Sequence, residues 1–196
     1  MSIKESVRTL LNYLFRGNNL IYSKIRNGGG VQISCGTNLS HCHIIVKKGG
    51  LLQIGERCEL NGLHIHVAPD SKVIIGDNVV VNASKKTPTL MNAFGNSKIL
   101  VGDGCLFSDS IQIHTTDYHS LLREGIRYNY PKDVIIGNHC WIGLSVVILK
   151  GVKLAKNTVV GAGSIISKSF EEENTIVAGN PASLVRSNIE WNIKNI

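Results

Sequence analysis

The feature that most constrains this chain is an aliphatic repeat with a period of six residues. Between residues 134 and 167 it runs unbroken through Ile136, Ile142, Ile148, Leu154, Val160 and Ile166. An α-helix repeats every 3.6 residues and a strand every second residue, so neither produces this period. Four residues after an aliphatic position comes a compact residue, at Cys140, Val146, Val152, Thr158 and Ser164. The pattern predicts an all-β parallel β-helix of triangular coils, with the aliphatic side chains inside and glycines at tight corners.

The rest of the chain divides around this repeat. Residues 1–27 contain an apolar pattern of helical spacing among basic residues, which predicts a short amphipathic helix over 4–16 that caps the first coil. The alternative for this helix is a peripheral contact with a membrane surface. The β-helix is expected over 28–181, and a short tail over 182–196. Its first interior positions are expected at Ile33, Leu39, Ile45 and Leu51.

Two breaks in the period predict external loops. They lie near residues 83–98, which include Pro88, Asn92 and Gly95, and at residues 115–133. A break in a regular coil has to leave the coil, and loops on a rigid scaffold commonly carry ligand contacts. The two loops are therefore where binding residues are expected.

Charge and cysteine content narrow the class of protein. The net charge of +7 favours an anionic ligand, while the absence of a Lys/Arg block or nucleic-acid-binding module argues against nucleic acid. The five cysteines form no CxxC pair and are odd in number, which argues against a disulfide framework. Cys58, Cys105 and Cys140 each stand in an Ile/Val-Gly-x-x-Cys frame and are expected as small buried side chains. Without a signal-peptide pattern or a run of about 18 apolar residues, a cytoplasmic protein is expected.

Several segments resemble a known family. They are Ile-Ile-Gly-Asn-His-Cys-Trp-Ile-Gly from Ile135, Val-Gly-Ala-Gly-Ser from Val160, and Val-Ala-Gly-Asn-Pro-Ala from Val177. Together they resemble the left-handed β-helix acyltransferases of the hexapeptide-repeat family. The segment Ile-Gln-Ile-His-Thr-Thr-Asp-Tyr-His, which ends at His119, most resembles bacterial capsule and polysaccharide O-acetyltransferases, with sugar acetyltransferases one step further away. The resemblance implies left-handed coils, a homotrimer with sites between subunits, and direct transfer from acetyl-coenzyme A to a saccharide hydroxyl, with no metal.

His119 is the candidate general base. Acetyl transfer to a hydroxyl needs a base with a near-neutral pKa, which an imidazole supplies. His119 lies where the coil gives way to a loop, and its Asp-x-His step resembles the family's catalytic histidine. Asp117, two residues earlier, is expected to fix the imidazole tautomer. His114 competes for the role of base, but relatives tend to have a basic residue there, which favours an acceptor-side or structural role.

The resemblance also implies acceptor-side and carrier-side residues. Trp141 matches the family's tryptophan and is expected to form a flat wall against the acceptor or the acyl arm. Tyr118 and Asn92 are expected on the acceptor side together with His114. The residues expected to bind acetyl-coenzyme A are Gly143, Leu144, Ala162, Gly163, Lys168 and Arg186. Leu144 stands where sugar acetyltransferases usually have serine, so it retains a backbone donor but no hydroxyl.

Other functions remain open from the sequence. One alternative is an N-acetyltransferase that acetylates the amine of an amino-sugar nucleotide. Another is a serine O-acetyltransferase. The pairs His41-Cys-His43 and His64-Ile-His66 are expected on strand faces, where stacked coils bring them together. They allow a zinc-dependent enzyme related to carbonic anhydrase, although that family places its ligands in a different pattern. A non-catalytic scaffold is the third possibility, but it has no need of two irregular loops.

Overall fold

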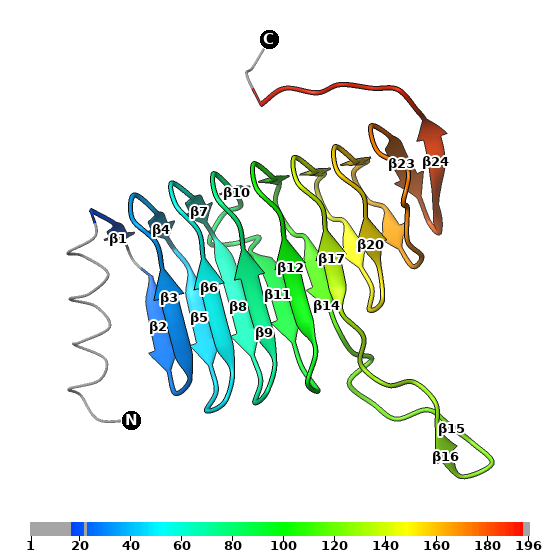
Figure 1. Cartoon of the computed structure of the whole chain (residues 1–196), viewed down its shortest axis with the longest axis horizontal. Helices are drawn as coiled ribbons and strands as arrows, with labels where there is room; N and C mark the ends of the chain where they lie inside the picture. Colours follow the sequence, from blue (N-terminus) through cyan, green and yellow to red (C-terminus); the bar gives the residue numbers. More distant parts are fainter. Residues whose placement is uncertain (1–16, 22, 194–196) are drawn as a thin grey trace.

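The computed structural model describes residues 17–21 and 23–193, so the helix predicted over 4–16 lies outside the described residues. In the part that it describes, every regular element is a strand. The fold is a left-handed parallel β-helix, seen in Figure 1 as a row of stacked coils. Each complete coil contributes one strand to each of three parallel sheets, which we call sheets A, B and C.

The strands of the three sheets follow one another in a constant order along the chain. Sheet A contains β1 (Asn19–Ile21), β4 (Asn38–Ser40), β7 (Glu59–Asn61), β10 (Val80–Asn82), β13 (Leu106–Phe107), β18 (Trp141–Ile142), β21 (Val159–Val160), β23 (Ile176–Gly179) and β24 (Ala182–Arg186). Sheet B contains β2 (Lys24–Asn27), β5 (His43–Val46), β8 (Leu63–Val67), β11 (Thr89–Ala93), β14 (Gln112–His114), β19 (Val147–Ile148) and β22 (Ile165–Ile166). Sheet C contains β3 (Gly30–Ile33), β6 (Leu51–Ile54), β9 (Lys72–Ile75), β12 (Lys98–Val101), β17 (Val134–Ile136) and β20 (Lys153–Leu154).

The interior predicted from the six-residue repeat is confirmed. The aliphatic positions from Ile136 to Ile166 are all buried, as are the compact positions from Cys140 to Ser164. The buried thiols bond to neighbouring coils; Cys58 Sγ donates to the carbonyl of Gly76 over 3.2 Å. Burial raises the pKa of the Cys42 thiol to about 11, so this thiol stays protonated at neutral pH. The four buried cysteines, Cys42, Cys58, Cys105 and Cys140, therefore act as small hydrophobic residues, while Cys35 is exposed.

Coil length varies along the molecule, and this corrects the predicted start of the repeat. In the C-terminal coils Trp141 pairs with Val159, 18 residues later, but in the N-terminal coils Leu39 pairs with Leu60, 21 residues later. The longer coils have strands of four or five residues in sheet B, which expose alternate side chains. Ile45 and Leu51 therefore point outward, and the interior is filled by Ile44, Val46, Leu52 and Ile54 instead.

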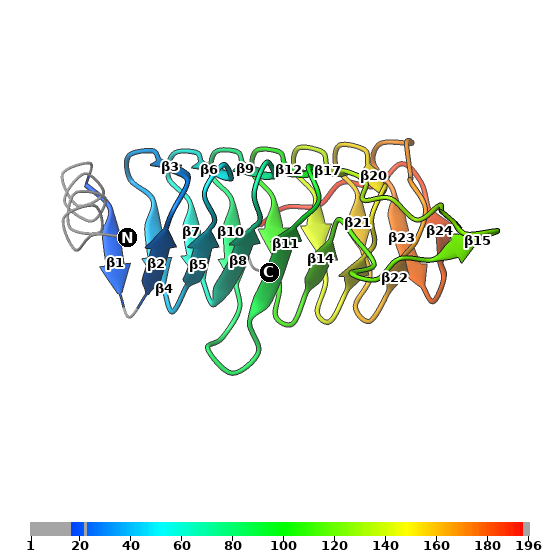
Figure 2. The same cartoon turned by 90° about the horizontal axis from the view of Figure 1, so that it is seen from below.

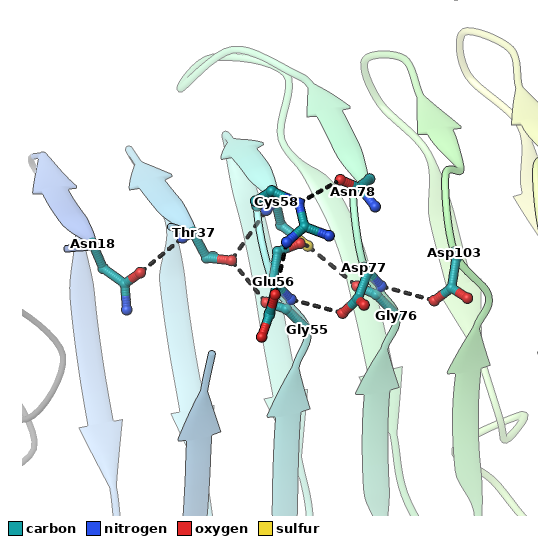
Figure 3. A network of polar contacts seen from close by, with 10 residues as sticks. Asn18, Thr37, Gly55, Glu56, Cys58, Gly76, Asp77, Asn78 and Asp103 are labelled. Atoms are coloured by element: carbon teal, nitrogen blue, oxygen red, sulfur yellow. Dashed lines mark hydrogen bonds and ion pairs between the residues drawn. The ribbon is translucent and has the colours of Figure 1, made fainter. Parts of the chain in front are cut away.

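The corners between sheets C and A are held by a ladder of polar side chains, shown in Figure 3. Asp77 Oδ1 accepts the backbone N–H of Glu56 over 2.8 Å, and Asp103 Oδ1 accepts that of Asp77 over 2.8 Å. A Cβ at Gly76 would lie 2.2 Å from Asp103 Oδ1, so only glycine fits this corner. The repeated Gly-Asp pattern thus positions each coil on the next.

The structure also corrects the segment boundaries. Strands β1 and β2 begin the coils at residues 19 and 24, inside the N-terminal segment 1–27 and before residue 28, where the β-helix was expected to start. At the other end, β24 pairs antiparallel with β23, so the predicted tail starts as part of sheet A. The loop predicted near 83–98 is shorter, because Thr89–Ala93 form β11, and Lys98 begins β12. The residues between β10 and β11 form the protruding loop in Figure 2.

The second loop, residues 115–133, leaves the coil between β14 and β17. It ends in a hairpin of β15 (Leu122–Arg123) and β16 (Ile126–Arg127), which projects from the prism in Figure 1. Within residues 17–21 and 23–193 there is no helix with the length and apolarity needed to cross a membrane.

Candidate active site

The loop at 115–133 presents His119 through an unusual turn. The backbone N–H of His119 donates to the carbonyl of Asp117 over 2.7 Å, and Tyr118 between them has a φ of 63°. This is the hydrogen bond and the positive φ of a γ-turn, a strained conformation for a residue with a side chain. Strain of this kind persists only where the surroundings enforce it. The imidazole of His119 is exposed at the tip of this turn.

Asn129 enforces the turn from the other side of the loop. Its Nδ2 donates to the carbonyl of His119 and to Asp117 Oδ2, both over 2.7 Å. Its Oδ1 accepts the backbone N–H of Leu121, also over 2.7 Å. The Asn129 side chain is buried, so one amide spans both arms of the loop. A single side chain therefore holds the turn that carries His119, through two hydrogen bonds with the backbone and one with the Asp117 carboxylate.

Asp117 anchors the loop to the coil, which differs from its predicted role. Its carboxylate accepts from Lys150 Nζ at 2.5 Å as well as from Asn129. The hydrogen bond from Lys150 is the main reason why the pKa of Asp117 lies below its usual value. Both contacts fall on Oδ2, and in the described residues no hydrogen bond joins Asp117 to the imidazole of His119. Asp117 thus positions the turn, and the expected fixing of the tautomer is not seen.

His114 lies in β14 with both of its ring nitrogens bonded. Gln112 Oε1, which can only accept, lies 3.2 Å from Nε2, so Nε2 carries the hydrogen. Nδ1 then accepts from the hydroxyl of Tyr118 over 2.9 Å. Burial lowers the pKa of His114, which keeps the ring neutral at neutral pH. A base needs a free nitrogen, so this geometry favours a structural or acceptor-side role for His114.

The loop rests on the outward face of sheet B. The ring of Tyr118 packs edge-on against His114 and Phe94, with centroids 5.6 Å away in both cases. Asn92 pairs with His114 in the register of β11 and β14, and its Nδ2 lies 3.5 Å from His114 Nδ1. Four of the residues predicted from sequence, Asn92, His114, Asp117 and Tyr118, are therefore gathered beside His119.

Trp141 lies on a different face of the prism. It is in β18 of sheet A and is 39% exposed. Trp191 packs beside it at 5.9 Å and stacks on His139 at 4.2 Å. The indole of Trp191 donates to the carbonyl of His139 over 2.9 Å, which fixes the C-terminal segment on the coil. Trp141 is thus one wall of an exposed aromatic surface.

Four of the residues predicted for the carrier, Gly143, Leu144, Ala162 and Gly163, lie together at the edge that follows sheet A. Gly143 N–H donates to the carbonyl of Val160, and Gly163 N–H donates to that of Leu144 over 2.7 Å. A Cβ on Gly143 would lie 2.8 Å from the Ala162 nitrogen, whereas one on Gly163 would meet no atom within 4 Å. Gly143 is required by the packing of coils, and Gly163 leaves open surface.

Lys168 and Arg186 lie on the last coil. Lys168 follows β22 and lines a hollow of about 290 Å³ with Glu171, Glu172 and Leu184. Its ammonium is 5.6 Å from the centre of the Phe170 ring. Arg186 ends β24 and is exposed. Lys168 thus follows a strand of sheet B, two strands beyond β14, and Arg186 pairs with Ile176 at the start of β23, so neither cation lies at the edge that follows sheet A.

The predicted residues thus form two groups on one chain. One surrounds His119 at the corner that follows sheet B, and the other, of Gly143, Leu144, Ala162 and Gly163, follows sheet A, with Trp141 beside it; Lys168 and Arg186 belong to neither group. Lys150, Asn129 and Gln112 were not predicted, although each contacts a predicted residue. Asn129 gave no signal in the sequence because an asparagine in a loop is ordinarily a solvated turn residue.

The histidine pairs also differ from the prediction. His64 and His66 share the outward face of β8, but His41 precedes β5 at a corner with a φ of 54°. The close approach is between His43 and His64, whose ring centroids are 5.6 Å apart. Among the described side chains, no three histidine, cysteine or acidic groups are arranged to hold a metal ion.

The sequence and structure match known proteins. Residues 133–168 match the bacterial transferase hexapeptide family. Galactoside O-acetyltransferase of Escherichia coli (strain K12) is 29% identical over 152 residues, which cover 76% of this chain and 72% of that protein. Polysialic acid O-acetyltransferase of Neisseria meningitidis is 46% identical over 99 residues, half of this chain and 46% of that protein. The crystal structure of the polySia-specific acetyltransferase NeuO has a TM-score of 0.72 at 25% identity, covering 91% of this chain and 86% of that one.

Fold, repeat and relatives point to one class: residues 133–168 match the hexapeptide transferases, and the chain is similar to acetyltransferases in sequence and in its left-handed β-helix. Within that class it resembles O-acetyltransferases, and the relatives named above act on galactosides and on polysialic acid. The matched part of this chain spans less than half of the Neisseria protein.

Proposed function

We propose that this chain transfers acetyl from acetyl-coenzyme A directly to a hydroxyl of a saccharide or polysaccharide, with His119 as general base. The observation that carries the proposal is the constrained presentation of His119, whose backbone is held by Asn129 while its imidazole is exposed. A base that removes a hydroxyl proton needs a positioned backbone and a free ring nitrogen. Both ring nitrogens of His114 are bonded, whereas among the described residues no hydrogen bond engages the ring of His119.

The proposed mechanism forms one bond and breaks one. His119 takes the proton of the acceptor hydroxyl, whose oxygen attacks the thioester carbonyl; the tetrahedral intermediate then expels the coenzyme A thiolate, which recovers a proton from the imidazolium. Backbone N–H groups stabilise the oxyanion. Gly143 N–H is already bonded to Val160, so the N–H of Leu144 is the donor we assign to this role. Lys168 and Arg186 bind the phosphates of the carrier, and Ala162 and Gly163 allow the pantetheine arm to approach.

A screen of acceptors with labelled acetyl-coenzyme A tests this proposal. We expect label to enter saccharide hydroxyls, and sialic acid oligomers and galactosides are the first acceptors to try because relatives carry those names. Serine and amino-sugar nucleotides belong in the same screen, since label on serine or on an amine would replace the saccharide. A protein that transfers no label to any of these acceptors, yet is folded, would contradict the proposal.

The assembly that we propose is a homotrimer whose active sites are completed between subunits. The two groups of candidate residues lie at different corners of one prism, so a second chain is needed to bring them to the same acceptor. The hairpin supplies a contact surface, because Leu122, Ile126 and Tyr128 are 62%, 71% and 60% exposed. Exposed apolar side chains gathered on a projecting element mark interaction sites.

Mass measurement in solution should therefore give three chains per particle. Replacing Leu122 and Ile126 together by serine removes the apolar contact and should shift the particle towards monomers, with activity lost in the same concentration range. Replacing the exposed Lys153 in sheet C by serine is the matched control. A monomer with full activity would rule out the shared site.

Carrier binding gives a separate expectation. Replacing Lys168 or Arg186 by alanine should raise the KM for acetyl-coenzyme A about tenfold and leave kcat nearly unchanged, because a phosphate contact is made equally in the ground and transition states. Steady-state kinetics at varied acetyl-coenzyme A measures this split. The control is Lys156→Ala, which removes an exposed lysine from an earlier coil. An unchanged KM in both variants would exclude the two cations from the carrier site.

A further inference from the structure

The outward face of sheet B carries two continuous rows of side chains. The proposed catalysis gives a role only to the side chains nearest the His119 loop. The register places Lys24, His43, His64, Leu90 and Gln112 in one row. It places Arg26, Ile45, His66, Asn92 and His114 in the other. Neither row contains an acidic residue. From β2 to β14 the face therefore offers cations, imidazoles and amides, interrupted by Leu90 and Ile45, and β14 leads into the turn that carries His119.

The end of this face that is far from His119 is hollowed. A cavity of about 460 Å³ is lined by Lys24, His41, Cys42, His43, His64 and Lys85. Two lysines and three histidines thus meet around one space without a carboxylate among the lining residues. Nε2 of His43 is buried beside this cavity, and among the described residues it has no hydrogen-bond partner.

Lys85 is held over this cavity by the protruding loop between β10 and β11. Asp109 Oδ1 accepts the backbone N–H of Ser84 over 2.7 Å and the hydroxyl of Thr87 over 3.0 Å. The Ser84 and Thr87 hydroxyls also lie 2.6 Å from each other. Because both ends of the turn are tied to Asp109, Lys85 is presented from a fixed loop.

The charges on the face suit an anion whose position is set by hydrogen bonds. Burial, followed by the neighbouring His43, lowers the pKa of His64. Burial also lowers the pKa of His66, with smaller contributions from Lys47 and His43. Both rings are therefore neutral hydrogen-bonding groups at neutral pH, and the permanent charge comes from Lys24, Arg26 and Lys85.

The length of the face indicates the size of the ligand. From His43 in β5 to Gln112 in β14 there are three strand spacings, which amount to about 14 Å. Aromatic contacts continue the face to the catalytic loop, since Phe94 packs on His66 at 4.7 Å and on Tyr118 at 5.6 Å. A single monosaccharide at His119 does not reach the cavity, whereas an oligosaccharide chain of several residues does.

We propose that this face is an extended acceptor track, on which an acidic polysaccharide lies with its reacting residue at His119 and a carboxylate of a distant residue in the cavity between Lys24 and Lys85. This inference rests on the proposed function and adds that the acceptor is an anionic polymer gripped far from the reacting hydroxyl. In this proposal His43, His64 and His66 are hydrogen-bonding groups for the polysaccharide.

Direct binding tests the track independently of catalysis. Calorimetry at low salt compares a sialic acid octamer, a dimer and a carboxyl-reduced octamer on the wild-type protein and on the double variant Lys24→Ala/Lys85→Ala. We expect the octamer to bind best and the double variant to bind it about tenfold more weakly, since exposed ion pairs are worth roughly two- to fivefold each. The matched control is Lys72→Ala, which removes an exposed lysine from sheet C.

Three outcomes overturn the track: equal binding of dimer and octamer, equal binding of the octamer and its carboxyl-reduced form, or a double variant that binds the octamer as the wild type does. Coenzyme A serves as a further probe, because its phosphates are also anions. If the double variant weakens coenzyme A binding and spares the octamer, the cavity belongs to the carrier. Acetylation of the dimer by a protein that shows no octamer preference would leave the proposed function standing and remove only the track.

Discussion

Replacing His119 by alanine is expected to lower kcat by about a hundredfold to ten-thousandfold, the usual contribution of a general base. The affinity for acetyl-coenzyme A should stay close to that of the wild type, because in the proposed mechanism His119 contacts the acceptor hydroxyl and not the carrier. Steady-state kinetics with a saturating saccharide acceptor gives kcat, and calorimetry gives the affinity for the carrier. The exposed position of His119 means that the substitution removes no packing from the coil.

His114→Ala is the discriminating comparison for this result. It removes the partner of the Tyr118 hydroxyl and of Gln112, so we expect a higher KM for the acceptor and a much smaller fall in kcat. Both variants need a check of particle mass, since loss of assembly imitates loss of the base. Should His114→Ala lose turnover while His119→Ala retains it, the two assignments are reversed.

The second large effect is expected from a residue that touches no substrate in our proposal. Asn129→Ala removes the hydrogen bonds to the carbonyl of His119, to Asp117 and to the N–H of Leu121. Misplacement of a catalytic group by about 1 Å can cost a hundredfold in rate, so kcat should fall by about that factor. Acetyl-coenzyme A affinity should be unchanged, which separates loss of positioning from loss of the fold.

The chain offers a control for Asn129 in the same loop. Arg123 lies in the exposed hairpin strand β15, and Arg123→Ala should leave the turn at His119 intact. Lys150→Ala removes the anchor on Asp117 Oδ2 from the coil side and should give a partial version of the Asn129 effect. Full activity of Asn129→Ala would mean that the strained turn is not needed for catalysis.

The β-helix could be predicted because its cause is local and repeated. Each position from Ile136 to Ile166 is buried for the same reason, and six repeats of one pattern leave no competing period. The N-terminal coils were placed in the wrong phase because their strands are longer, and a coil of 21 residues between Leu39 and Leu60 does not keep a six-residue period. Ile45 and Leu51 were misplaced for that reason.

The amino-acid sequence by itself determined the type of coil, the two excursions from it and the segment that carries His119. What holds that segment was decided only by the tertiary structure. Asp117 meets Lys150 from 33 positions away, and Asn129 meets His119 across the loop. The apposition of His43 and His64 likewise depends on the register of β5 and β8. Such contacts follow from how coils stack and loops return, and a side chain's neighbours on the next coil carry no signature in its own local sequence.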